Sequence, residues 1–416
     1  MSIRVGSAED VTTAVQRFAS RRTPSGPPRV VASGNFATPH PLLQAVDAAL
    51  ASYRLNVLNA QAGLPMRAGV VHETSFVGPG VRRSAALAYV PSRLSLLPAL
   101  LGTALVPDIV LLHCSKPWHG KVSLGIEVNV LPAAVEAVRQ RGGLVLAQLN
   151  ERMPYTFGDG ELSDDLVDLA IEVDEPMPSP HGTRADAASR RIGELVAERV
   201  PDGSTLQLGI GAIPDAALDG LVDRTGLRIW SEMIGDGVLR LEQEGALDPA
   251  AEVVASFMFG SSDLYRWVDR NPRVRMARTE RANDPASISQ QPRMTSINSA
   301  LEVDLFAQAN ASRREGWIHS GFGGATDFLV GALHARDGQA LIALRSWHPK
   351  ADVSTVVALL DEPVTSFQPT AIITEQGVAE VRGHTEHEQA LAIIEHAAHP
   401  DVRDELTEEA HHLGLV

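Results

Sequence analysis

The chain has 416 residues, of which 44% are hydrophobic, which predicts a globular protein with two or three domains. Its formal net charge of -15 disfavours nucleic acid and anionic membranes as partners, and no apolar stretch is continuous enough to predict a membrane span. The single cysteine, Cys114, excludes a disulfide framework within one chain, and the first ten residues lack the apolar segment of a signal peptide. We therefore expect a soluble protein in a reducing, cytoplasmic setting.

Each half of the chain contains the same order of sequence patterns. A helical pattern is followed by a Pro/Gly turn, a short apolar strand, a G-x-x-A-x-P motif and a second helix, over residues 11–43 and again over residues 192–218. This repetition predicts that the two halves fold as related domains.

Short apolar runs bounded by turns alternate with helical patterns through the rest of the chain, which is typical of parallel sheets in an α/β fold. Residues 176–182 (PMPSPHG) have the composition of a linker. We therefore expect two open-sheet α/β domains, residues 1–183 and 184–416, with the active site in the cleft between them. The further predicted strands are residues 108–113, 144–149, 252–257, 340–344 and 370–374.

The carboxylate of Glu232 lies where a short apolar strand runs into a glycine-rich turn, in residues 230–237 (WSEMIGDG), and a helix is predicted to begin near Asp236. Ligands in open α/β sheets bind at the carboxyl ends of strands. Glu232 is therefore a candidate nucleophile or base. The structural alternative is that it caps or solvates the turn.

Gly209 and Gly211 follow a predicted strand and precede a helix, which is the context of a phosphate-binding loop. The rival hypothesis is a dinucleotide fingerprint, in which Glu232 binds a ribose hydroxyl in a dehydrogenase. Pro214 in place of the third glycine disfavours that alternative.

A second glycine cluster contains Gly321, Gly323 and Gly324, and it predicts either an oxyanion hole or a tight turn. The histidines in residues 384–399 do not have the spacing of a zinc site, so no metal is expected. Cys114 lies in an apolar strand pattern and is expected to be a small buried hydrophobic residue.

In order along nearly the whole chain, the motifs resemble the acetyl-CoA hydrolase/transferase family of class I CoA-transferases, which includes 4-hydroxybutyrate and other acetyl-CoA:carboxylate CoA-transferases. The motifs that carry the resemblance are residues 76–83, 89–95, 108–112, 119–125, 150–158, 209–216, 231–238, 297–305, 321–328, 373–379, 382–383 and 398–406.

The resemblance implies two related domains of the type shared with sugar-phosphate isomerases. It places the catalytic glutamate of the S-E-M motif at Glu232, with Glu302 and Glu375 as the next carboxylates to consider. The acyl and CoA-thioester surroundings are implied at Gly209, Gly211, Asn298, Gly323 and Gly324.

The activity implied is CoA transfer from an acyl-CoA, acetyl-CoA by family resemblance, to a small carboxylic acid. It proceeds by a ping-pong mechanism through an acyl-glutamyl anhydride and a glutamyl-CoA thioester, with no cofactor beyond the substrate coenzyme A. A homodimer or higher homo-oligomer is expected. The alternatives are an acyl-CoA hydrolase that uses the same glutamate and, more remotely, an NAD-binding dehydrogenase.

The chain departs from the family pattern at positions that bear on the substrate. Residues with different side chains stand where the family commonly has a serine, Gln-Val, two arginines and a tyrosine. These departures put the identity of the acids in doubt more than the chemistry. They are Gly235, Ala325 with Thr326, Val330, Gln368 and Gln376.

Overall fold

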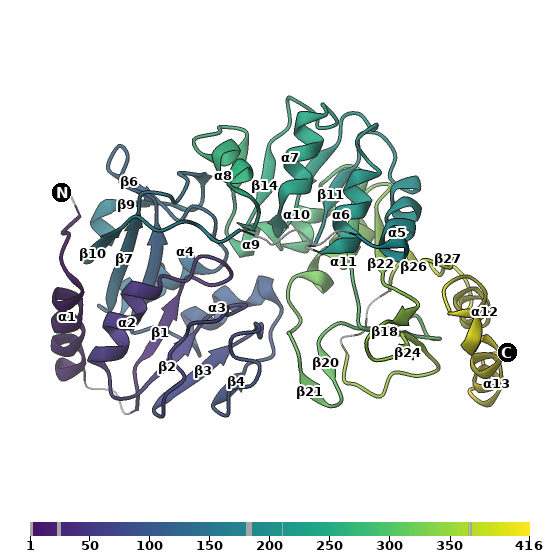
Figure 1. The fold of residues 1–416 in the computed structure, drawn as a ribbon, viewed down its shortest axis with the longest axis horizontal. Helices are drawn as coiled ribbons and strands as arrows, with labels where there is room; N and C mark the ends of the chain where they lie inside the picture. Colours follow the sequence, from purple (N-terminus) through teal and green to yellow (C-terminus); the bar gives the residue numbers. More distant parts are fainter. Residues whose placement is uncertain (1–2, 23–25, 180–184, 210, 365, 367) are drawn as a thin grey trace. The chain divides into compact units, whose positions relative to one another are not determined.

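The computed structural model describes residues 3–22, 26–179, 185–209, 211–364, 366 and 368–416 (Figure 1). The chain divides into two compact units. The predicted boundary between residues 183 and 184 lies outside the described residues. The first unit comprises Met1–Pro180, Val254–Ala282 and Ile318–Gly323, and the second comprises His181–Val253, Asn283–Trp317 and Gly324–Val416.

Among the described residues of the first unit, seven parallel strands form a sheet in the order β10-β7-β5-β1-β2-β3-β4. The strands are β1 (Arg29–Ala32), β2 (Tyr53–Asn56), β3 (Val70–Thr74), β4 (Leu87–Tyr89), β5 (Ile109–Cys114), β7 (Leu144–Asn150) and β10 (Leu169–Val173). The helices that accompany them are α1 (Ala8–Arg21), α2 (His40–Ala49), α3 (Leu97–Gly102) and α4 (Leu131–Gln140).

The first sheet is buried on both faces. Ile109 and Leu111 of β5 share a core with residues of α1 and α2, whereas the intervening Val110 and Leu112 are also fully buried and point to the opposite face because side chains alternate along a strand. Helix α4 contacts β5 and β7. Burial on both faces explains why β5 is a continuous apolar run in the sequence. Cys114 is buried in β5, as predicted.

In the second unit, the strands follow the order β27-β26-β22-β17-β11-β12. All neighbouring pairs are parallel except β26 with the edge strand β27. The strands are β11 (Thr205–Gln207), β12 (Arg228–Trp230), β17 (Met294–Asn298), β22 (Gln339–Ala343), β26 (Ala371–Thr374) and β27 (Gly377–Glu380). The helices are α5 (Ala187–Glu198), α6 (Ala212–Asp219), α7 (Asp236–Gln243), α10 (Pro285–Ser289), α11 (Ala325–His334), α12 (Glu386–His396) and α13 (Arg403–His412).

The predicted repetition is confirmed in the order of elements. Helix α1, strand β1 and helix α2 correspond to α5, β11 and α6. The repeated strand also has equivalent neighbours in the two sheets. In the first unit β1 pairs with β2 and with the later β5, and in the second unit β11 pairs with β12 and with the later β17. The predicted α/β fold with parallel sheets is thus confirmed, and all five further predicted strands overlap strands of the structure.

Smaller elements complete the described chain. Within the first unit, β6 pairs antiparallel with β9, and β16 pairs parallel with β8; within the second, β18 pairs with β19 and β25, and β23 pairs with β24. No helix among the described residues is long and apolar enough to cross a membrane. The remaining bounds are β6 (Lys121–Ser123), β8 (Phe157–Gly158), β9 (Glu161–Ser163), β13 (Met233–Ile234), β14 (Val253–Ala255), β15 (Phe257–Met258), β16 (Val274–Met276), β18 (Glu302–Asp304), β19 (Ala309–Asn310), β20 (Arg313–Arg314), β21 (Trp317–Ile318), β23 (Trp347–His348), β24 (Val353–Ser354), β25 (Val356–Val357), α8 (Ser262–Val268), α9 (Thr279–Ala282), and the 3-10 turns Leu94–Leu96, Asp164–Leu166 and Pro400–Val402.

Candidate active site

The order of strands in the second unit reverses at β11, since the chain places β12 on one side of β11 and the later β17 on the other. Such a reversal is where open α/β sheets bind ligands, outside the carboxyl ends of the strands. Three polar side chains occupy that edge. Gln207 ends β11, Asn298 ends β17, and Glu232 lies two residues after the end of β12.

Ser231 fixes the backbone immediately before Glu232. This serine is fully buried, its hydroxyl donates to the Leu208 carbonyl at 3.2 Å, and it accepts from the Leu208 N–H at 3.3 Å. The two bonds tie the end of β12 to the end of β11. Helix α7 then begins at Asp236, as predicted, so the glutamate lies on a short turn held at both ends.

The carboxylate of Glu232 is held on one side by Asn283 and Gly324. The Nδ2 group of Asn283, whose side chain is completely buried, donates to Oε2 of Glu232 at 2.8 Å. A Cβ atom added to Gly324 would lie 1.8 Å from the same Oε2 and 2.2 Å from Asn283 Nδ2. Only a glycine leaves room for this carboxylate and its donor, which explains the residue type at position 324.

Burial raises the pKa of Glu232 to about 7. The hydrogen bond from Asn283 opposes that rise in pKa, and the negative charge of Asp327, a buried residue in the first turn of α11, adds to it. A carboxylate that is desolvated while still ionisable near neutral pH is more basic and less shielded than one in water. Such perturbed groups gather at functional sites, so the chemistry favours a nucleophile or base over a cap of the turn.

Asn298 lies at the same edge of the sheet, in a buried network of amide and hydroxyl groups. Its Nδ2 donates to Gln207 Oε1 at 3.0 Å and to Ser296 Oγ at 2.8 Å, and the Ser296 hydroxyl donates to Gln207 Oε1 at 2.8 Å. The network joins the ends of β11 and β17 beside the β12 end. Asn298 therefore lies at the same edge of the sheet as Glu232, and its contact with an acyl group stays a prediction.

The glycines that the sequence predicts around CoA and the acyl group lie in different parts of the structure. Gly209 follows β11, and Gly211 precedes α6 with a φ of 131°, which glycine adopts without strain. Gly323 belongs to the first unit, where an added Cβ would lie 3.0 Å from the Phe76 ring, whereas Gly324 belongs to the second. Of these glycines, Gly324 is the one that directly contacts Glu232 in the described part of the second unit, and their contacts with CoA stay predictions.

The other carboxylates singled out by sequence are bound by local partners. Glu375 accepts hydrogen bonds from the N–H and hydroxyl of Ser346, and Glu302 accepts from Asn310 Nδ2 at 3.2 Å. Gln376, where the family commonly has a tyrosine, donates to Ser346 Oγ at 3.3 Å. These bonds join Glu302 of β18 to Asn310 of β19, and Glu375 to Ser346.

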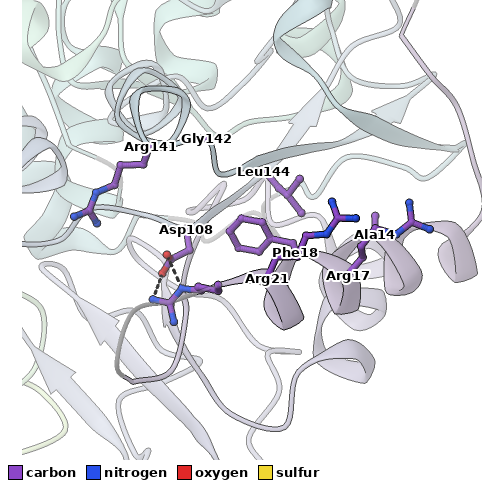
Figure 2. Close-up of a pocket in the computed structure, with 9 residues that line it drawn as sticks. Ala14, Arg17, Phe18, Arg21, Asp108, Arg141, Gly142 and Leu144 are labelled. Carbon is purple, nitrogen blue, oxygen red and sulfur yellow. Dashed lines mark hydrogen bonds and ion pairs between the residues drawn. The ribbon is translucent and has the colours of Figure 1, made fainter.

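A hollow of about 730 Å³ lies in the first unit, beside the end of α1 and the start of β7. Figure 2 shows Asp108 among the lining residues, and Arg22 pairs with this carboxylate at 2.8 Å. The exposed side chains of Arg17, Arg21 and Arg141 add positive charge around it. Because Asp108 and Leu144 lie at the amino ends of β5 and β7, the rule for ligand sites in α/β sheets does not place the reacting centre here.

Similarity to known proteins identifies the family. Residues 260–410 match the model of the acetyl-CoA hydrolase/transferase C-terminal domain. The chain is 34% identical to the 4-hydroxybutyrate coenzyme A transferase of Clostridium kluyveri over 353 residues, covering 81% of each protein. The chain belongs to the acetyl-CoA hydrolase/transferase family. The predicted family and the predicted enzyme class, CoA-transferase, are confirmed.

Two further relatives of the family bear on its activity and fold. An acetyl-CoA hydrolase of Kluyveromyces lactis is 28% identical, over 68% of this chain and 58% of the hydrolase. The crystal structure of RipA from Yersinia pestis matches with a TM-score of 0.90 at 26% identity, covering 99% of this chain and 98% of that one. The family thus contains relatives named as transferases and relatives named as hydrolases.

The enclosure of Glu232 predicts the effect of Gly324→Ala. The added methyl group cannot coexist with Oε2 at 1.8 Å, so the carboxylate must move, and a displaced catalytic group loses about 10²-fold or more in rate. The φ of Gly324 is -97°, an ordinary value, so the backbone itself accepts alanine. Turnover of acyl-CoA and the unfolding temperature of the variant measure the two effects separately.

Gly102→Ala is the matched control, because its added Cβ meets no atom within 4 Å and its backbone is likewise outside the left-handed region. We expect full activity from it. Full activity of Gly324→Ala would contradict the described position of the Glu232 carboxylate.

Proposed function

We propose that this CoA-transferase moves CoA from an acyl-CoA to a small carboxylic acid through covalent intermediates on Glu232. The single observation that supports this most strongly is the position of Glu232, a glutamate of the S-E-M motif at the carboxyl edge of the second sheet, where Asn283 donates to its carboxylate at 2.8 Å and burial raises its pKa to about 7. The relatives named 4-hydroxybutyrate coenzyme A transferase and succinyl-CoA:acetate/propanoyl-CoA:succinate CoA transferase support the reaction class.

The proposed cycle begins with ionised Glu232, which attacks the thioester carbonyl of the acyl-CoA. The C–S bond breaks, CoA leaves as a thiolate, and an acyl-glutamyl anhydride remains. The thiolate then attacks the glutamyl carbon, which releases the first carboxylate and leaves a glutamyl-CoA thioester. A second carboxylate attacks this thioester, and the two steps run in reverse to give the new acyl-CoA and free Glu232.

This proposal requires no cofactor beyond coenzyme A itself, because one thioester is exchanged for another of similar energy. The first acyl donor is acetyl-CoA by family resemblance, and the acceptor is a small carboxylic acid. The cytoplasmic setting and the homodimer or higher oligomer also stay predictions from the sequence and the family resemblance.

Hydrolysis is the second candidate function, and the similarity to an acetyl-CoA hydrolase favours its consideration. If water reaches the anhydride or the glutamyl thioester before the second carboxylate does, the same glutamate hydrolyses acyl-CoA. Exclusion of water therefore separates the two activities.

Replacing Glu232 by glutamine tests the nucleophile. Glu232→Gln keeps the shape of the side chain and removes the attacking charge, so we expect turnover to fall by about three or more orders of magnitude while the fold survives. Wild-type protein incubated with acyl-CoA alone should carry CoA as a thioester on Glu232, detectable by intact mass, and borohydride should inactivate it only when acyl-CoA is present.

Glu302→Gln is the control for this experiment, because Glu302 is also a glutamate that accepts a hydrogen bond from an asparagine side chain. It should keep its activity. A fully active Glu232→Gln protein, with activity lost in Glu302→Gln or Glu375→Gln instead, would move the nucleophile to that residue.

The pH dependence of the first half-reaction follows from the pKa of Glu232. Because the ionised form attacks, the rate of glutamyl-CoA formation should fall about tenfold per unit as the pH drops below about 7 and level off above it. Asp327→Asn removes a negative charge that raises the pKa of Glu232, so the midpoint of the pH–rate profile should move to lower pH. Any ionisation of the substrate itself should be unaffected by this substitution. If the wild-type pH–rate profile had its midpoint near the usual pKa of glutamate, that result would argue against a Glu232 carboxylate whose pKa is raised by burial.

Adding an acceptor separates transferase from hydrolase. Acetyl-CoA is assayed with each of a panel of small carboxylic acids as acceptor. We expect formation of a new acyl-CoA to require the acceptor acid and to follow ping-pong kinetics. Loss of acetyl-CoA at the same rate with and without any acceptor, and free CoA as the product, would establish the hydrolase instead.

A further inference from the structure

The hollow of about 730 Å³ in the first unit is lined by one face of α1 and by the turn between α4 and β7. Ala14, Arg17, Phe18 and Arg21 are spaced by three and four residues, which places them on the same side of the helix. In Figure 2 these residues come from α1, whereas Arg141 comes from a separate loop. The hollow therefore brings together side chains from two elements that are far apart in the sequence.

Three of the arginines around the hollow have no acidic partner. Arg22 forms two hydrogen bonds of 2.8 Å with the carboxylate of Asp108, so this pair adds no net charge. Among the residues that the structure describes, no carboxylate lies within 4.0 Å of the guanidinium groups of Arg17, Arg21 and Arg141. All three side chains are exposed. A cluster of three unpaired positive charges stands out in a chain whose formal net charge is -15.

The ends of two helices explain only part of this charge. Arg21 lies in the last turn of α1 and Arg141 caps the C-terminal end of α4, where the helix dipole favours a cation. Each helix end is equivalent to about half a negative charge, so the two ends together offset about one of the three positive charges. Arg17 lies a turn before the end of α1 and, four residues from Arg21, is repelled by it. The cluster therefore needs another explanation.

The hollow also has an apolar wall. The half-buried side chains of Ala14, Phe18 and Leu144 pack against the core of the first unit and line the hollow from that side. An aromatic ring such as that of Phe18 offers a flat surface on which another ring can stack. The volume of about 730 Å³ falls in the range of about 300–1,000 Å³ that is typical of small-molecule sites. The lining thus favours a molecule that has both negative charges and an apolar ring.

We propose that this hollow binds a nucleoside polyphosphate. The phosphates pair with Arg17, Arg21 and Arg141, because a guanidinium group donates two parallel hydrogen bonds to phosphate oxygens. The nucleobase packs against Phe18 and Leu144. Bound phosphates also remove the repulsion between the two arginines of α1, so the ligand and the cluster stabilise each other.

The site differs from the proposed reacting centre in its place on the fold. The hollow lies at the amino ends of β5 and β7, whereas the reacting centre of an open α/β sheet lies at the carboxyl ends of strands. The same chemistry has two sources, a free nucleotide or the adenosine diphosphate part of CoA. A ligand that contacts α1 and the turn before β7 at once binds only the folded unit, so it should raise the unfolding temperature.

Calorimetric titration of the full-length protein with three probes tests the class of ligand. The probes are ATP, tripolyphosphate and adenosine, without divalent metal ions. We expect ATP to bind at least tenfold more tightly than either of the others, and its affinity to fall as salt is added. Equal affinity for tripolyphosphate would overturn the assignment of a nucleoside, and equal affinity for adenosine would overturn the role of the arginines. Absence of ATP binding would overturn the whole proposal.

Variants on the two sides of the hollow test its location. The double variant Arg17→Gln with Arg21→Gln should bind ATP about 10²-fold more weakly, and Arg141→Gln about tenfold more weakly, since each loses charged hydrogen bonds to phosphate. Without ATP, the double variant should unfold at the wild-type temperature or slightly above it, because a repulsion is removed. Arg141→Gln gives an independent result on a different element should the double variant fail to fold. Unchanged ATP affinity in both proteins would place ATP elsewhere and overturn the proposal.

Arg191→Gln is the matched control. Arg191 is an exposed arginine of α5, the helix that corresponds to α1 in the second unit, and it pairs with Glu194 at 3.1 Å. We expect this variant to bind ATP with wild-type affinity. An equal loss of affinity in Arg191→Gln would show that total charge, and not the hollow, controls binding.

Titration with CoA separates the two sources of the ligand. A second CoA molecule that binds the wild type and is lost in the Arg17→Gln, Arg21→Gln protein would identify CoA as the ligand of the hollow. One CoA molecule in both proteins, with ATP binding lost in the variant, would identify free nucleotides. Loss of the only bound CoA together with acyl-CoA turnover would make the hollow part of the substrate site and overturn its separation from the reaction.

Discussion

The proposed chemistry depends on one contact, in which a buried neutral amide holds a carboxylate that the protein has partly removed from water. Burial and Asp327 raise the pKa of Glu232, and Asn283 opposes the rise without cancelling the charge. An arginine in the place of Asn283 would stabilise the ionised carboxylate far more and would lower its pKa, and with it the basicity of the attacking oxygen. A neutral donor orients the carboxylate of Glu232 while it leaves the negative charge of the carboxylate available for attack. In the proposed mechanism, the choice of an amide at this position is therefore part of the activation of Glu232.

The fold provides this contact through the topology of one sheet. The crossing of the chain at β11 brings the ends of β11, β12 and β17 together, although they are separated by long segments of sequence. Ser231 and the network of Gln207, Ser296 and Asn298 then join these ends by side-chain hydrogen bonds. The first unit has the same strand arrangement around β1, where burial lowers the pKa of His113 in β5 to about 4 and Asn35 donates to the buried Glu127 at 2.7 Å. The two units thus share the topology that brings strand ends together, and the side chains at those ends determine the chemistry that each edge can support.

Much of this could be predicted from the sequence because it depends on local patterns. The strands, α7 and the position of Glu232 at a strand end follow from apolar runs and glycine turns, and Gly324 was found as part of a glycine cluster. Asn283 was missed, since it lies 51 residues from Glu232, and its neighbours Asp284 and Pro285 read as an ordinary helix start. The assignment of residues 254–282 to the first unit was equally inaccessible, because alternating strand and helix patterns do not say which sheet a strand joins. Pairing between distant segments is the information that local patterns lack.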